Sequence, residues 1–233
     1  MCTDASRFSI VLVHGAFADA SSWRKVISLL QKDGFSVTAV QNALLSLADD
    51  VETTKRVINS QERDVVLVGH SYGGAVITEA AAGNLKVKGL VYVAAFAPDA
   101  GETLAELGEK FPAAPLGSAV VPDSAGFLYV DRSKFHQVFA NDLDEEEASI
   151  MAATQKPIAG VIFAEPIKAA AWKSLPSWYV VSTMDRAINP DLERFMAERM
   201  SAFTSEINSS HVGFISNAAE IAKTIESAAS QIE

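Results

Sequence analysis

The stretch VVLVGHSYGGAV, residues 65–76, decides the fold. Its first four residues are Val or Leu, and such a run is typical of a strand buried on both faces of a parallel sheet. Residues 69–73 match the pattern G-x-S-x-G, and helical spacing begins at Tyr72. A strand that turns sharply into a helix, with a serine at the turn, predicts a nucleophile elbow at Ser71.

The neighbours of Ser71 suit such an elbow. Gly69, Gly73 and Gly74 leave room for a backbone that turns so sharply that larger side chains would collide. The helix that starts near Tyr72 directs its N-terminus at the serine, where free N–H groups and the helix dipole favour developing negative charge. The sequence therefore predicts Ser71 as a catalytic nucleophile.

The rest of the chain repeats the alternation of strand and helix. Short apolar runs rich in Val and Ile occur at residues 9–13, 35–40, 65–68, 89–94, 178–181 and 203–207. Helical spacing occurs between them, at residues 22–32, 47–61, 72–82, 191–200 and 217–231. This order predicts a doubly wound α/β fold, with a mostly parallel six-stranded sheet and helices on both faces.

One stretch interrupts the alternation. Residues 99–172 are too many for a simple crossover and contain five prolines, so we interpret them as an inserted helical cap, or lid. Residues 1–98 and 173–233 would then form the core. Helices are expected at 135–139 and 145–154. The aromatic side chains of the cap either line a pocket or pack the cap onto the core, and for any single one packing is favoured: Phe111, Phe127, Tyr129, Phe135, Phe139 and Phe163.

A serine hydroxyl is a weak nucleophile unless a base removes its proton, so one of the four histidines should serve it. His14 lies in the turn after the first strand, His70 is next to the serine, and His136 is in the cap. His211 follows the last predicted strand, at the sheet edge where loops converge on the elbow. We therefore predict His211 as the general base.

The base needs a carboxylate that fixes its tautomer and stabilises the imidazolium. Asp185 comes just after the strand at 178–181 and gives the chain order Ser, Asp, His, which this architecture requires. Asp99 is a rival, since it follows the strand at 89–94, although it is also explained as a loop residue after a proline. We favour Asp185.

A tetrahedral oxyanion needs two backbone donors. One is expected to be the N–H of Tyr72, the residue after the nucleophile, and the other should come from the loop after the first strand. We choose Ala16 for the second donor, because Gly15 lets this loop approach closely. Phe17 is then expected to line the substrate pocket.

Composition excludes several classes of function. The chain has 233 residues, a net charge of −10 and a pI near 4.9, so nucleic acid is an unfavourable partner. The only cysteine, Cys2, allows no intramolecular disulfide. We find no signal peptide at the start and no membrane span, and we expect a cytoplasmic protein. No phosphate-binding loop, dinucleotide fingerprint or H-E-x-x-H motif occurs, so neither a cofactor nor a metal is expected.

Four segments together resemble the α/β-hydrolase superfamily over nearly the full chain, and within it a small subgroup of plant methyl esterases, hydroxynitrile lyases and bacterial esterase relatives. They are VLVHGAFADASSW (11–23), LVGHSYGGAV (67–76), WYVVSTMDRAINP (178–190) and SSHVGFISN (209–217). The resemblance implies the triad Ser71, Asp185 and His211, the donors Ala16 and Tyr72, and a cap at 99–172. Hydroxynitrile lyases carry a lysine after the catalytic histidine, whereas this chain has Val212, which argues against lyase activity.

We therefore expect a serine hydrolase that cleaves small to medium carboxylic esters through an acyl-enzyme. A cofactor-free carbon–carbon hydrolase, lyase or perhydrolase would use the same triad, because the cap sets the choice of substrate. A hydrolase-like protein that binds a small molecule with little turnover is an alternative of another class. The sequence indicates neither the ester nor the oligomeric state.

Overall fold

The computed structural model describes residues 7–232, so Cys2 and the start of the chain lie outside the described residues. Six strands form one sheet in the order β2-β1-β3-β4-β8-β9, and each neighbouring pair is parallel. The strands are β1 (Phe8–Val13), β2 (Ser36–Val40), β3 (Asp64–Ser71), β4 (Val87–Ala95), β8 (Ser177–Ser182) and β9 (Phe203–Ile207). The predicted six-stranded parallel sheet is confirmed.

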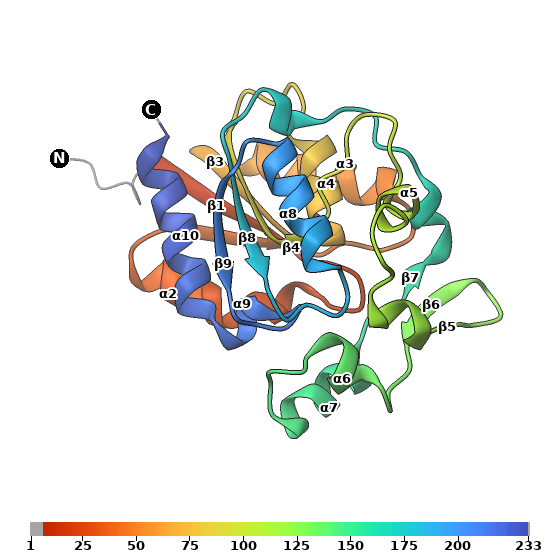
Figure 1. The fold of residues 1–233 in the computed structure, drawn as a ribbon. Coiled ribbons are helices and arrows are strands. Elements are labelled where there is room, and N and C mark those ends of the chain that lie inside the picture. The colour runs from red at the N-terminus through yellow and green to blue at the C-terminus, as the bar shows by residue number, and fades with distance from the viewer. Residues whose placement is uncertain (1–6, 233) are drawn as a thin grey trace.

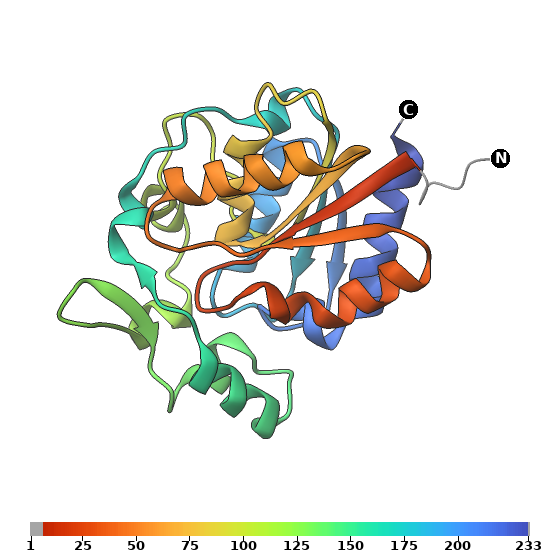
Figure 2. The ribbon, with the colours of Figure 1, turned by 180° about the vertical axis from the view of Figure 1, so that it is seen from behind.

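Helices cover both faces of this sheet (Figures 1 and 2). One face carries α2 (Arg24–Lys32), α9 (Gly213–Ser216) and α10 (Ala218–Gln231), with the short helix η1 (Ala20–Trp23) leading into α2. The other face carries α3 (Leu47–Ser60), α4 (Tyr72–Ala80) and α8 (Pro190–Arg199). Because helices cover both faces, the inner strands are mostly apolar, and every residue of β1 and β8 is buried.

The segment 99–172, which we call the cap segment, is only partly helical. It contains α5 (Leu104–Gly108), α6 (Phe135–Phe139) and α7 (Glu145–Thr154), the last two with the predicted bounds. It also contains a three-stranded antiparallel sheet that the sequence did not predict, formed by β5 (Val120–Pro122), β6 (Phe127–Val130) and β7 (Ile158–Ala159). Short 3₁₀ helices complete it: η2 (Pro115–Ala119), η3 (Gly160–Ala164) and η4 (Ala171–Lys173).

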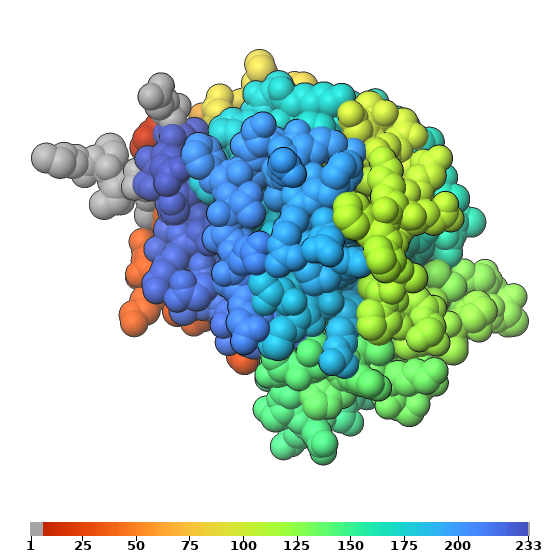
Figure 3. Space-filling model, viewed as in Figure 1, coloured from red at the N-terminus to blue at the C-terminus, as the bar shows by residue number. Residues whose placement is uncertain are grey.

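The green part of the cap segment, with α6 and α7, forms a lobe that projects beyond the C-terminal ends of the strands, and the parts before and after it run along the side of the body (Figures 1 and 3). Backbone and side-chain hydrogen bonds attach the cap segment to the rest of the chain. The Ala159 N–H donates to the Leu44 carbonyl at 2.9 Å, and Glu165 accepts from the Leu47 N–H at the start of α3 at 3.0 Å. The cap segment is therefore held against the loop that follows β2.

Within residues 7–232, no helix has both the length and the apolar character needed to cross a bilayer.

Candidate active site

Ser71 occupies the turn between β3 and α4, as the elbow prediction requires. Its backbone has φ 55° and ψ −125°, a region that residues with a side chain rarely adopt. Such strain persists only where the surrounding structure enforces it, and it gathers at functional sites. Ser71 is the last residue of β3, and only 7% of it is exposed.

Two glycines allow the close packing that enforces this turn. A Cβ atom on Gly73 would lie 2.5 Å from the carbonyl oxygen of Val13, so only glycine lets α4 begin against the end of β1. A Cβ atom on Gly15 would lie 2.6 Å from the Cβ of Ser71. The loop after β1 therefore packs directly against the serine.

Ser71, His211 and Asp185 form one chain of hydrogen bonds. The His211 Nε2 atom lies 2.8 Å from the Ser71 Oγ, and its Nδ1 atom lies 2.6 Å from the Asp185 Oδ2. An ionised carboxylate can only accept, so the Nδ1–H donates to Asp185 and Nε2 is left to accept the serine proton. The three residues predicted from the sequence meet in the geometry of a nucleophile, a base and its orienting acid.

The loop after β8 fixes the orientation of Asp185. Its Oδ1 atom accepts from the backbone N–H groups of Ala187 at 2.6 Å and Ile188 at 3.0 Å. Its Oδ2 atom is thereby turned towards His211. Both partners are almost fully removed from solvent, with 5% of Asp185 and 1% of His211 exposed.

The sequence did not predict what surrounds His211. The His70 Nε2–H donates to the carbonyl oxygen of His211 at 2.8 Å, and burial holds the pKa of His70 well below its usual range, so this ring is neutral. The ring of Phe139 packs edge-on against the His211 ring, with centroids 5.0 Å apart. One contact comes from the residue before the nucleophile and the other from the cap segment.

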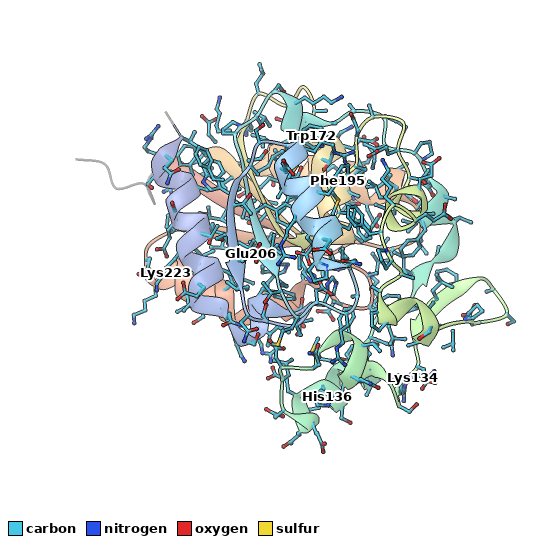
Figure 4. The ribbon with its side chains drawn as sticks, in the orientation of Figure 1. Lys134, His136, Trp172, Phe195, Glu206 and Lys223 are labelled. Carbon is cyan, nitrogen blue, oxygen red and sulfur yellow. The ribbon has the colours of Figure 1, made fainter. Side chains whose placement is uncertain are left out.

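The rival residues lie elsewhere. Asp99 forms an ion pair with Lys173 at 2.5 Å. His136 lies on α6 in the cap segment, where its Nε2–H donates to the Leu143 carbonyl at 2.9 Å (Figure 4). The His14 Nε2 atom accepts from the backbone N–H of Asn42 at 3.0 Å, which places this histidine between two loops.

Of the two predicted oxyanion donors, Tyr72 follows the serine directly in the chain, and Ala16 belongs to the loop that packs against it. Tyr72 is the first residue of α4, so its N–H has no acceptor within the helix. Its hydroxyl donates to the buried Asp50 at 2.9 Å, which anchors the start of α4 to α3. Ala16 follows Gly15, the residue that packs against Ser71, and 5% of it is exposed.

A cavity of about 510 Å³ lies between α7 of the cap segment and residues 17–24, and none of Ser71, His211 and Asp185 lines it. Its lining combines the apolar side chains of Phe17, Ile150, Met151 and Ile215 with the charged side chains of Asp19, Arg24, Asp144, Glu146 and Glu147. Phe17 also contacts Phe139, edge to face, with ring centroids 6.1 Å apart. The Phe17 ring therefore lies between the cavity and the ring that packs on His211.

No group of three or more His, Cys, Asp or Glu side chains within residues 7–232 is arranged to hold a metal ion. The chemistry that the arrangement supports is nucleophilic: an activated serine, a neutral base and a buried acid.

Comparisons with known proteins agree with this fold. The model of the alpha/beta hydrolase family matches residues 10–224. Alpha/beta hydrolase nvfD of Aspergillus novofumigatus is 27% identical over 82% of this chain and 83% of its own length. Methylesterase 2 of Arabidopsis thaliana is 24% identical over 87% of this chain and 88% of its own. The crystal structure of a pyrethroid hydrolase from Sphingobium faniae superimposes with a TM-score of 0.83, at 21% identity, over 96% of this chain and 98% of that one.

Proposed function

The chain belongs to the alpha/beta hydrolase family, and on that premise we propose that it hydrolyses small to medium carboxylic esters through an acyl-enzyme on Ser71. The observation that carries the proposal is the hydrogen-bonded chain from Ser71 through His211 to Asp185. A relative named methylesterase supports an ester as the substrate. We also propose that residues 99–172 act as the cap over the substrate.

The proposed reaction has two halves. Ser71 Oγ attacks the carbonyl carbon of the ester while its proton passes to His211 Nε2, and the buried Asp185 stabilises the imidazolium. The N–H groups of Ala16 and Tyr72 hold the oxyanion. When the intermediate collapses, the carbon–oxygen bond breaks and the alcohol leaves with the proton from His211. A water molecule then gives a proton to His211 and attacks the acyl carbon; the bond from that carbon to the Ser71 Oγ breaks, His211 returns the proton to the Oγ, and the acid leaves.

The cavity suggests where the substrate lies. The apolar part of its lining suits an apolar acyl or alcohol group, and Phe17 links this part to Phe139, whose ring packs on His211. Every step of this reaction uses only groups of the chain and water. We therefore propose a small-molecule ester as its one partner, and we propose that the protein works in the cytoplasm.

The test is hydrolysis of p-nitrophenyl acetate and butyrate by Ser71→Ala. We expect kcat/KM to fall by roughly 10⁴-fold or more, with the fold retained by circular dichroism. Ser9→Ala is the matched control, because Ser9 is a buried serine on β1 away from the elbow, and it should hydrolyse at the wild-type rate. Hydrolysis by a folded Ser71→Ala at the wild-type rate would reject Ser71 as the nucleophile.

A further inference from the structure

A second buried carboxyl group lies behind Asp185. Glu193 belongs to α8, which packs over β8 (Figure 1), and none of its surface is exposed. Its Oε2 atom accepts from the backbone N–H of Ser182, at the end of β8, at 3.1 Å. The carbonyl oxygen of the same Ser182 accepts from the Asp185 N–H at 3.1 Å, so Glu193 and Asp185 meet at this residue with their carboxyl groups as neighbours. The proposed mechanism gives Glu193 no part.

Two adjacent buried carboxyl groups do not both ionise, because the second charge would meet both burial and like-charge repulsion. The donors decide which of them keeps the proton. Asp185 accepts from two backbone N–H groups and from His211. Glu193 accepts from one, and its Oε1 atom meets no N–H or O–H donor among the described residues. The carboxyl group with fewer hydrogen-bond donors, that of Glu193, therefore keeps the proton.

The other ionisable groups around Glu193 do not reverse this assignment. Burial and then the charge of Asp185 hold the pKa of Glu193 well above its usual range. Tyr179, on β8, binds the backbone of Ala95 through its hydroxyl, and burial keeps its pKa well above its usual range, so it remains neutral. Arg194, on the same helix, forms ion pairs with Asp191 and Glu206 at the surface.

We propose that Glu193 is a positioning residue of the triad, whose protonated carboxyl group donates a hydrogen bond to Asp185. This bond adds a donor to the three that already hold the Asp185 carboxylate, and it keeps that carboxylate ionised and aimed at His211. The proposal rests on the proposed function, because it assigns Asp185 to the triad. Beyond that function, it proposes that Glu193 acts on His211 through Asp185.

Three variants separate positioning from simple packing. Glu193→Gln is neutral and keeps both bonds, since its amide can donate to Asp185 and accept from Ser182. Glu193→Met has nearly the same length and keeps neither bond. Leu192→Ala, a buried neighbour on α8, weakens the packing of the helix and leaves Glu193 intact.

The common readout is the rate at which a fluorophosphonate labels Ser71, followed from about pH 5 to 10, because it needs no assumption about the ester. We expect Glu193→Gln to stay within about threefold of the wild type and Glu193→Met to fall by roughly 10- to 100-fold. The acidic limb of the Glu193→Met profile should shift to higher pH. Without the hydrogen bond from Glu193, the Asp185 carboxylate stabilises the protonated form of His211 more strongly. Leu192→Ala should lower the melting temperature and leave the profile in place.

Infrared difference spectroscopy tests the proton itself. A protonated-carboxyl C=O band should be present in the wild type and absent from Glu193→Gln. The proposal would be overturned if no such band is lost, if Glu193→Gln labels as slowly as Glu193→Met, or if Glu193→Met labels like the wild type. Labelling that follows the expected pattern without turnover of any ester would instead reject the proposed function and leave the role of Glu193 standing.

Discussion

The side chains of the proposed triad, Ser71, His211 and Asp185, are fixed by neighbours of two kinds. Some are local, such as the N–H groups of Ala187 and Ile188, which lie two and three residues after Asp185. Others are distant in sequence, such as the ring of Phe139 and the imidazole of His70, which position His211. Both kinds restrict the base to one orientation.

In the proposed mechanism, Asp185 orients His211. Asp185→Asn should lower kcat by about 10⁴-fold with little loss of fold, because an amide presents a donor or a weak acceptor to His211 and no longer holds the reactive tautomer. Steady-state kinetics with a p-nitrophenyl ester measure the change. Asp99→Asn is the matched control, since Asp99 pairs with Lys173 outside the site, and its kcat should not change. A loss shared equally by both variants would contradict the assignment of Asp185.

The sequence could place residues whose position is set locally, while their catalytic roles stay predictions. Ser71 could be placed at the turn because strand, turn and helix are contiguous, and Asp185 and His211 could be placed near it because each follows a strand whose end reaches the same edge of the sheet. His70 and Glu193 carried no such signal. Their contacts with His211 and Asp185 depend on the tertiary packing of α8 and of the loops, which no local pattern encodes.

At the scale of elements, the elbow depends on how closely α4 begins against β1. Gly73→Ala should destabilise the fold by about 1–3 kcal/mol and lower activity, because its Cβ would lie 2.5 Å from a backbone oxygen that cannot move aside cheaply. Thermal and urea unfolding measure the change. Gly108→Ala is the control, since a Cβ there meets no atom within 4 Å. Equal stability of the two variants would contradict this account of the elbow.

The bounds of the longest helices agree closely with those expected from the helical spacing of the sequence. The helix expected at 47–61 is α3, Leu47–Ser60, and the one expected at 217–231 is α10, Ala218–Gln231. The small sheet of the cap segment escaped prediction because its strands have two to four residues each. Such strands are too short for alternation to be recognised, and β7 pairs with β6 across about 30 residues of intervening chain.

At the scale of the whole molecule, buried histidines link stability to pH. Burial lowers the pKa of His14 from 6.5 to about 4, and Lys156 adds to the shift while Asp19 opposes it. The folded state then binds fewer protons than the unfolded chain between these values. The contribution of neutral His14 to stability is therefore complete above about pH 6.5 and is lost as the pH falls towards about 4.

Unfolding by urea at a series of pH values tests this linkage. Relative to His14→Asn, the wild type should lose up to about 3 kcal/mol of unfolding free energy between about pH 6.5 and 4. The comparison removes the contributions of the carboxylates, which both proteins share. A difference between the two proteins that stays constant over this range would show that His14 does not lose its proton affinity on folding.

The proposed function depends on the formation of an acyl-enzyme on Ser71. Burst-phase kinetics on p-nitrophenyl acetate, combined with peptide mapping after fluorophosphonate labelling, tests this step. We expect a burst of one p-nitrophenolate per active site and a single adduct on the peptide that carries Ser71. An adduct on another residue, or no burst and no adduct in folded protein, would contradict the claim.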